Sequence, residues 1–291
     1  MSSSPIMAGQ PFSPEKTTQI AEQFFRDGYV YIPNVLTPGE VSTLRERTDQ
    51  LLDDPDLMES TNPNLADVRY VQLGKHQTTG EDLPFILRNT IELDQMFRDM
   101  LLREPIFSLA EAIVGTNCKF CGQNVLRNKP GLSIDRWHVD GEVHFPLPDS
   151  IERYDSRIRM RVMWFTVQMA LSDIELIEHG PTQYVPVSHY SGRNPNNQEN
   201  PEFEGNNPVS IFCKAGDIYL QDPMCWHRGA PNNSDRTRYI LQSQYAAPWA
   251  YWRFSLCNRV PVEEEALQTA SDQLLNLLGR PRPNGAYNLE F

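Results

Sequence analysis

After Gly115 the sequence changes to short runs in which apolar and polar residues alternate, and this pattern limits the fold more than any other feature. Successive side chains of a β-strand point to opposite faces, so the alternation predicts strands. Turn-favouring residues separate the runs at the intervals expected of a β-sandwich or jelly roll, and 23 prolines against 16 glycines agree with many turns and ordered loops. The runs are CKFCGQNVLRN, RMRVMWFTVQMAL, TQYVPVS, VSIFC, DIYLQD and RYILQSQYA.

Helices are predicted on either side of this β region. Ile20, Phe24 and Phe25 have helical spacing that ends at Gly28, a short strand YVYIPNV follows, and TPGEVSTLRERTDQLL begins a second helix with a threonine N-cap. Residues 53–90 are polar and predicted to be irregular, and residues 91–115 to form two more helices. We expect a single domain over 1–291: a helical part at about 14–115, a β core at about 116–256 and a C-terminal helix at about 262–279.

The charge and the cysteine content limit which partners the protein is expected to bind and in which compartment it is expected to fold. A net charge of −12 argues against a nucleic-acid partner, because such binding depends on Lys and Arg contacts to phosphate. No basic leader and no apolar run of membrane-spanning length is present, so we expect a soluble, cytoplasmic monomer or homodimer with no membrane partner. Five cysteines suit a reducing compartment. Cys118 and Cys121 form a CxxC without a second ligand pair, so we predict two strand cysteines and no zinc site.

Two histidines and two carboxylates lie in the stretch RWHVDGEVHF. If this stretch is a strand, His138 and Asp140 point to the same face and can meet one metal ion. An HxD pair is frequent by chance, and a solvated histidine beside an aspartate is the ordinary interpretation. A metal site gains support from the segment after DIYLQD, where His227 follows a predicted strand and Arg238 begins the next one eleven residues later.

Two histidines and one carboxylate form the facial triad that binds Fe(II) and leaves three coordination positions open. Those positions suit a bidentate 2-oxo acid and then dioxygen. A fixed arginine matches the distal carboxylate of such a cosubstrate, which gives Arg238 a purpose. A zinc hydrolase that used His138, Asp140 and His227 would leave Arg238 without one.

At these motifs the chain resembles the phytanoyl-CoA dioxygenase-like branch of the Fe(II)/2-oxoglutarate-dependent oxygenases. The resemblance covers most of the chain, and the block that joins His227 to Arg238 is its most specific part. The resembling segments are FFRDGYVYIPNVLTPGEVSTLRERTDQLL, NKPG (128–131), WHVDG (137–141), EHGPTQYVPVSH (178–189) and WHRGAPNNSDRTRYIL (226–241).

The resemblance implies a mainly β, double-stranded β-helix (jelly roll, cupin-like) core with flanking N-terminal and C-terminal helices. It implies Fe(II) on His138, Asp140 and His227, and 2-oxoglutarate on Arg238. From the related ectoine hydroxylases, Gln123 is expected against the cosubstrate. The implied reaction uses O2, converts 2-oxoglutarate to succinate and carbon dioxide, and oxidises a bound substrate. Halogenases of this fold lack the carboxylate ligand, so the presence of Asp140 argues against halogenation.

Strand alternation suggests further site residues. In MWFTVQMAL, Trp164, Thr166 and Gln168 share one face, which we assign to the barrel interior because the other face is wholly apolar. We expect Gln168 beside the cosubstrate, and Trp164 either at the substrate or in ordinary packing. Gln242 and Gln244 share a face with Arg238 in the same way. His144 lies six residues after His138 and is a further candidate for substrate contact, together with Trp164 and Gln242.

Three loops complete the expectations. His179 and His189 are predicted to stabilise loops and not to act in catalysis. Val187 stands where many relatives have a glycine, which leaves the local turn geometry open. Residues 145–157 follow the HVD motif as a long insertion. We expect either a mobile lid or an ordered surface insertion, and the two interpretations have nearly equal support.

These features predict a dioxygenase that hydroxylates a small molecule, in secondary metabolism. Desaturation, cyclisation or epoxidation would use the same ligands. A non-catalytic cupin-like binding protein is the alternative from another class. It would be expected to lose a ligand or the arginine, and neither is lost in this sequence.

Overall fold

A computed structural model describes residues 9–62, 68–195, 199–253 and 267–280. Two antiparallel sheets form the centre of the molecule, which confirms the predicted jelly roll. The large sheet has the strand order β1-β11-β8-β13-β6-β5-β4, and the small sheet has the order β10-β9-β12-β7. The strands are β1 (Tyr29–Ile32), β2 (Thr61–Asn62), β3 (Val68–Arg69), β4 (Val71–Lys75), β5 (Asp82–Arg88), β6 (Lys119–Asn128), β7 (Ile134–His138), β8 (Trp164–Ala170), β9 (Thr182–Tyr184), β10 (Val209–Ser210), β11 (Ile218–Gln221), β12 (His227–Gly229) and β13 (Arg238–Ala246).

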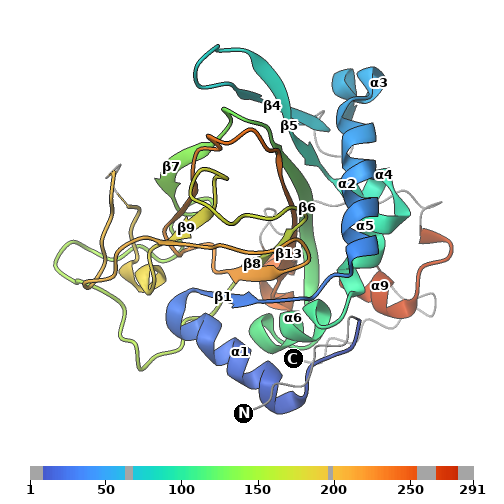
Figure 1. Cartoon of the computed structure of the whole chain (residues 1–291). Coiled ribbons are helices and arrows are strands. Elements are labelled where there is room, and N and C mark those ends of the chain that lie inside the picture. The colour runs from blue at the N-terminus through green and yellow to red at the C-terminus, as the bar shows by residue number, and fades with distance from the viewer. Residues whose placement is uncertain (1–8, 63–67, 196–198, 254–266, 281–291) are drawn as a thin grey trace.

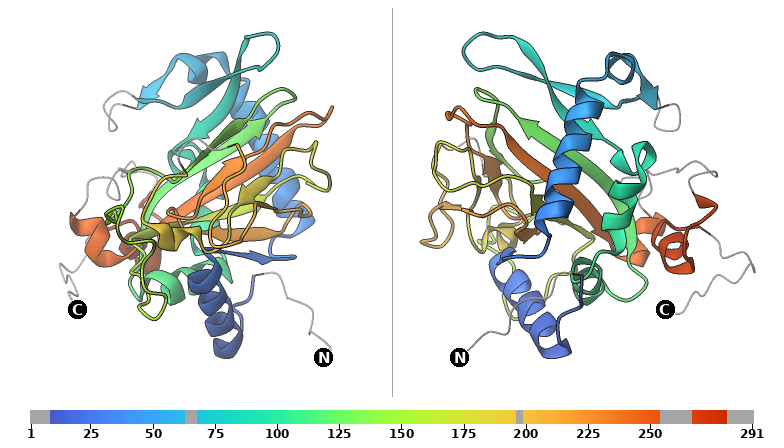
Figure 2. Two further views of the ribbon diagram at one scale, coloured as in Figure 1. Left: turned by 90° about the vertical axis from the view of Figure 1, so that its left-hand side faces the viewer. Right: turned by 45° about the vertical axis from the view of Figure 1, so that its right-hand side comes forward.

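Helices cover the face of the large sheet that is turned away from the small sheet (Figure 1). The right-hand view of Figure 2 shows α2 lying across this outer face. The α-helices are α1 (Pro14–Asp27), α2 (Pro38–Leu52), α3 (Pro55–Glu59), α4 (Thr90–Leu93), α5 (Gln95–Asp99), α6 (Ile106–Val114), α7 (Pro248–Arg253) and α9 (Asp272–Leu277), and the 3-10 helices are η2 (Met100–Leu102) and η3 (Ser188–Ser191).

The N-terminal helices begin and end at the predicted signals. Gly28 ends α1 in a left-handed conformation (φ 83°), which glycine adopts without a Cβ clash. Thr37 begins α2 with a capping box, in which its hydroxyl accepts from the Glu40 amide and the Glu40 carboxylate accepts from the Thr37 amide. Between these helices, β1 pairs with β11 and extends the large sheet.

The expectation of an irregular segment at residues 53–90 was wrong. Strands β4 and β5 form a hairpin that joins the large sheet at β6, with Ile86 opposite Leu126 and Arg88 opposite Asn124. Their burial is partial, so polar residues are frequent in both strands and the alternation is weak. The region predicted to be helical therefore also supplies one edge of the sheet.

Two other boundaries differ from the prediction. The helical segment 91–115 is divided into α4, α5, η2 and α6, because Asp94 is extended (φ −158°) and caps α5. Of the C-terminal helix predicted at about 262–279, residues 262–266 lie outside the described residues, and α9 spans Asp272–Leu277.

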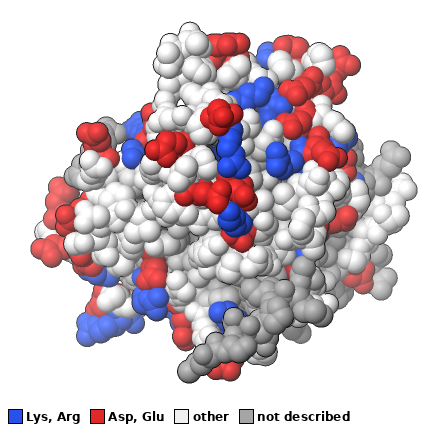
Figure 3. Space-filling model, in the orientation of Figure 1, with Lys and Arg blue, Asp and Glu red and all other residues white. Residues whose placement is uncertain are grey.

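The surface carries charges of both signs. On the face shown in Figure 3, acidic and basic side chains are interspersed, without a large basic field. Within the part of the chain that the structure describes, no helix has the length and hydropathy needed to cross a bilayer.

Candidate functional site

Two histidines meet where the strands of the small sheet pair. His138 ends β7 and His227 begins β12, and the two residues lie directly opposite each other in the antiparallel ladder. Asp140 follows β7 in a loop, where its backbone N–H donates to the Pro223 carbonyl at 2.8 Å. The strand predicted to run on through HVD thus ends at its first residue, and a loop contact orients Asp140.

The donor atoms of these three residues all lie within 4.8 Å of one another. Asp140 Oδ1 lies 3.7 Å from His138 Nε2 and 3.4 Å from His227 Nε2. The Nδ1 atoms of His138 and His227 lie 2.8 Å from the backbone carbonyls of Arg136 and Cys225. Since a carbonyl only accepts, Nδ1 carries the proton and Nε2 keeps a lone pair for a metal. The donor set therefore fits a single Fe(II) ion.

Burial and mutual contact shift the pKa values of the cluster. Burial and the neighbouring His227 lower the pKa of His138. Burial alone would raise the pKa of Asp140, but the histidines beside it outweigh burial and hold that pKa below its usual value. Burial likewise opposes protonation of His227, yet Asp140 raises its pKa overall. Asp140 is therefore ionised at neutral pH and offers a charged ligand.

Arg238 brings a positive charge into the same cavity. It begins β13, lies opposite Asn128 of β6 and is 3% exposed. One guanidinium nitrogen donates to the Gly180 carbonyl, and Nε has no hydrogen-bond partner among the described residues. Burial lowers its pKa, although not enough to remove the charge. An unpaired buried guanidinium is costly unless an anion binds it, so this site is suited to a carboxylate.

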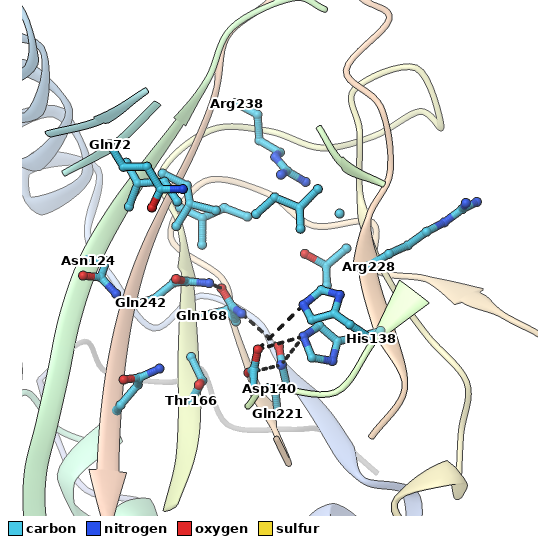
Figure 4. Close-up of a pocket in the computed structure, with 18 of the residues that line it drawn as sticks. Gln72, Asn124, His138, Asp140, Thr166, Gln168, Gln221, Arg228, Arg238 and Gln242 are labelled. Atoms are coloured by element: carbon cyan, nitrogen blue, oxygen red, sulfur yellow. Dashed lines mark hydrogen bonds and ion pairs between the residues drawn. The ribbon is translucent and has the colours of Figure 1, made fainter. Parts of the chain in front are cut away.

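A cavity of about 280 Å³ joins Arg238 to the three donor residues. Figure 4 shows His138 and Asp140 at one end and Arg238 across the cavity from them. Most of the wall is made of uncharged amides, hydroxyls and aliphatic side chains. The lining residues are Gln72, Ile86, Arg88, Asn124, Leu126, Ile134, His138, Asp140, Thr166, Gln168, Thr182, Gln221, His227, Arg228, Gly229, Arg238, Ile240, Gln242 and Gln244. The side chain of Arg228 turns away from the cavity and stacks on Trp137.

Gln168 and Gln242 line the cavity, whereas Gln123 does not. Gln123 points to the helical side of β6, where it bonds to Thr90, the Phe97 carbonyl and Ser243. Its neighbour Asn124 faces the cavity instead. Because both faces of β6 are largely buried, alternation could not show which face looks inward, and the structure places Gln123 outside the cavity and Asn124 on its wall.

Two of the residues predicted to contact the substrate also lie outside the cavity. Trp164 is 6% exposed and belongs to the main hydrophobic core, which leaves ordinary packing as its role. His144 does not line the cavity, because β7 ends at His138 and the chain turns away before it. Its backbone N–H instead lies 3.4 Å from the Met224 sulfur.

Gln221 was not predicted from the sequence. It ends β11, is 1% exposed and lies against two of the donor residues: its Nε2 is 3.0 Å from Asp140 Oδ2 and 2.9 Å from His227 Nε2. Its only sequence signal was a polar residue at the end of the apolar run DIYLQ, six positions before His227.

The loop histidines lie outside the cavity. His179 Nδ1 accepts from the Glu175 amide, and His189 Nε2 lies 3.1 Å from the Phe25 carbonyl. Between them Val187 has φ 69°, a left-handed conformation that costs a β-branched residue about 1 to 2 kcal/mol. The turn thus keeps the geometry that favours glycine although valine occupies it.

Residues 145–157 form a surface insertion without a helix or strand and contribute nothing to the cavity wall. Arg193 binds this segment by donating to the carbonyls of Pro148, Ile151 and Glu152. The Tyr154 amide also donates to the Tyr190 carbonyl at 2.9 Å. These contacts favour the ordered insertion over the mobile lid.

The chain is similar in sequence or in fold to several known proteins. An Aspergillus fumigatus protein named Dioxygenase af480 is 25% identical over 258 residues, 86% of this chain and 73% of that protein. The crystal structure of the non-heme alpha-ketoglutarate-dependent epimerase SnoN from nogalamycin biosynthesis superposes with a TM-score of 0.59 at 19% identity, covering 80% of this chain and 84% of SnoN.

HygX from Streptomyces hygroscopicus, solved with nickel and 2-oxoglutarate bound, superposes with a TM-score of 0.56 at 17% identity, covering 79% of this chain and 87% of HygX. The family model described as phytanoyl-CoA dioxygenase matches residues 24–240, well over half of the chain. The chain therefore belongs to the phytanoyl-CoA dioxygenase (PhyH) family and is an iron- and 2-oxoglutarate-dependent dioxygenase.

Proposed function

We propose that this dioxygenase hydroxylates a small molecule of secondary metabolism in the cavity between the two sheets. In the proposed site, His138, Asp140 and His227 hold Fe(II), and Arg238 binds the distal carboxylate of 2-oxoglutarate. One observation carries these assignments: a buried guanidinium with no carboxylate partner among the described residues lies in the same cavity as a His, Asp and His cluster. A binding protein with no anionic ligand has no use for that charge.

The bound iron and 2-oxoglutarate supply the oxidising power, with succinate and carbon dioxide as co-products. The chain's own residues orient the reactants. Arg238 would hold the cosubstrate by its distal carboxylate, and His138, Asp140 and His227 would hold the iron elsewhere in the same cavity. Aliphatic side chains around Arg238, including Ile134 and Ile240, limit water in that part of the cavity.

The substrate class rests on relatives and on the size of the cavity. SnoN has been solved with nogalamycin RO, and HygX with hygromycin B, so small natural products occupy this architecture. A cavity of about 280 Å³ suits such a molecule or part of one. Desaturation, cyclisation and epoxidation remain alternative outcomes, because the iron ligands select the oxidant and not the product.

We further expect a cytoplasmic monomer or homodimer. The described cysteines are all buried, and a total of five cysteines suits a reducing compartment better than a disulfide framework. Light scattering of the purified protein would distinguish a monomer from a homodimer.

Succinate formation tests the proposed function. The protein, supplied with Fe(II), 2-oxoglutarate and air, should release succinate slowly without substrate and faster when a natural-product library contains one. Gain of one oxygen atom with every carbon–carbon double bond retained identifies hydroxylation, gain of one oxygen with loss of a double bond identifies epoxidation, and loss of two hydrogens identifies desaturation or cyclisation. His227→Ala should abolish succinate release. Equal succinate from that variant and the unaltered protein would refute the assignment.

A further inference from the structure

Three glutamines on neighbouring strands form a chain of hydrogen bonds that ends at Asp140. Gln242 of β13 lies opposite Gln168 of β8, and Gln221 of β11 lies one diagonal step further on the same face. Gln242 Nε2 donates to Gln168 Oε1 at 2.9 Å, Gln168 Nε2 donates to Gln221 Oε1 at 2.9 Å, and Gln221 Nε2 donates to Asp140 Oδ2 at 3.0 Å (Figure 4). We call these three residues the glutamine relay.

The ionised Asp140 gives the relay a single direction. A carboxylate only accepts, so Gln221 must turn its NH2 group toward Asp140 and its oxygen toward Gln168. Gln168 must then donate to that oxygen and accept from Gln242. The Tyr184 hydroxyl also donates to Gln221 Oε1, at 2.8 Å. Reversing any one amide would place two donors or two acceptors against each other in a buried site.

The relay also distinguishes the two oxygens of Asp140. Gln221 occupies Oδ2, so Oδ1 is the oxygen that faces the histidines, 3.4 Å from His227 Nε2 and 3.7 Å from His138 Nε2. A hydrogen bond from an amide to one carboxylate oxygen favours the other oxygen as the one offered to a metal.

We propose that Gln221 is a positioning residue, held in one orientation by Gln168 and Gln242, that makes Asp140 a one-oxygen metal ligand. This inference rests on the proposed function, because it requires a metal on Asp140 and the two histidines. Gln221 acts through Asp140 and also lies 2.9 Å from His227 Nε2, and the two other glutamines act through Gln221. The relay thereby connects the cavity wall at Gln242 to the metal ligand set.

Cobalt binding tests the relay without turnover. The d–d absorption spectrum of Co(II) depends on the number and symmetry of its ligands, and titration with Co(II) measures affinity. Methionine is close to glutamine in size but cannot donate a hydrogen bond, so Gln221→Met and Gln168→Met break the relay at successive bonds. Gln244→Met is the matched control, because Gln244 lines the same cavity from β13 and is not in the relay.

Gln221→Met is expected to weaken Co(II) binding about 10- to 100-fold, as removal of a residue that orients a ligand does, and to change the spectrum. Gln168→Met should change the spectrum in the same direction with a smaller loss of affinity, and Gln244→Met should keep the spectrum and the affinity. An unchanged Co(II) spectrum in either relay variant overturns the proposal. If Gln221→Met does not fold, Gln168→Met decides alone, since it does not touch Asp140. Failure of the unaltered protein to bind Co(II) would instead count against the proposed metal site itself.

Discussion

Arg238 carries a charge into the interior with no carboxylate partner among the described residues, and at the residue scale this is a direct pointer to an anionic ligand. Gln221 differs from Arg238, because both the NH2 group and the oxygen of its buried amide have hydrogen-bond partners. Arg238 is therefore available to bind a ligand, whereas Gln221 is placed to orient Asp140. Both properties are visible only when each donor and acceptor is assigned its partner.

Replacing Arg238 by methionine is expected to weaken 2-oxoglutarate binding without destabilising the protein. Truncating one partner of a buried charge pair costs about 2 to 5 kcal/mol, so the Kd should rise roughly 30-fold or more. In the absence of 2-oxoglutarate the Tm should stay the same or rise, because an unpaired buried charge is removed. Calorimetric titration of the metal-loaded protein and thermal unfolding measure the two effects.

Arg236→Met is the control for this prediction. Arg236 lies two residues earlier, its side chain is 50% exposed, and it approaches Glu175 only at 3.9 Å. Its replacement should leave 2-oxoglutarate affinity unchanged. A loss of affinity in this variant but not in Arg238→Met would move the anion site to Arg236.

His189 makes the folded protein sensitive to acid. Burial lowers its pKa from 6.5 to about 4, despite the nearby Phe25 carbonyl. The unfolded chain therefore binds this proton first, and stability is lost as pH falls from 6.5 to 4, by about 3 kcal/mol in total. His189→Gln removes this titration and keeps a donor for Phe25. Denaturant unfolding should show a shallower acid dependence in the variant, and parallel profiles would contradict the prediction.

At the scale of elements, the strand pairings decide what lines the cavity. The β4–β5 hairpin contributes Gln72, Ile86 and Arg88 to the wall, although its sequence looks irregular. The insertion at 145–157 follows the HVD motif closely but contributes no wall residue. Proximity in sequence was therefore a poor guide to proximity at the site, because hydrogen-bonded register determines which segments face the cavity.

Residues 145–157 should already be protected from hydrogen exchange in the substrate-free protein. Arg193→Ala removes three donated hydrogen bonds from this segment, so its amides should exchange about 10- to 100-fold faster. Metal affinity should not change, since the segment does not reach the metal ligands. Mass spectrometry of exchanging peptides measures the effect.

Arg157→Ala provides the comparison, because Arg157 is an exposed arginine of the same segment whose hydrogen-bond partner among the described residues is Asp155. Hydrogen exchange of residues 145–157 in this variant should match that in the unaltered protein. Protection of residues 145–157 that appears only when substrate binds would restore the mobile-lid interpretation.

At the scale of the whole molecule, the N-terminal helix is part of the main core. Phe24 of α1 is fully buried, and its ring lies edge-on to Phe165 of β8 at 5.6 Å between centroids. The same core cluster continues to α9, where Leu274 and Leu277 belong to it. Elements from both ends of the described chain therefore cover one sheet.

Phe24→Ala is expected to reduce the free energy of unfolding by about 3 to 5 kcal/mol, the usual cost of deleting a buried aromatic ring. Because α1 shares the core, far-ultraviolet circular dichroism and tryptophan fluorescence should shift to lower denaturant concentration together. Glu22→Ala, on the exposed face of the same helix, should change little. Separate transitions for the two probes would show that α1 unfolds independently.

The sequence by itself determined the features that depend on local periodicity and spacing. The strands after Gly115, the capped helices α1 and α2, and the spacing from His227 to Arg238 are short-range patterns that the backbone translates directly into geometry. They were sufficient to predict the jelly roll, the three donor residues and the buried arginine.

Only the tertiary structure decided which side of β6 faces the cavity and where along β8 the cavity ends. Asn124 lines the wall in place of Gln123, because β6 carries polar residues on both of its largely buried faces, and Trp164 lies in the core although Thr166 and Gln168 on the same face of β8 line the cavity. Gln221 meets Asp140 across 81 residues of sequence, through the packing of the two sheets against each other. Such a contact has no local pattern, since it arises from the register of strands that the sequence keeps far apart.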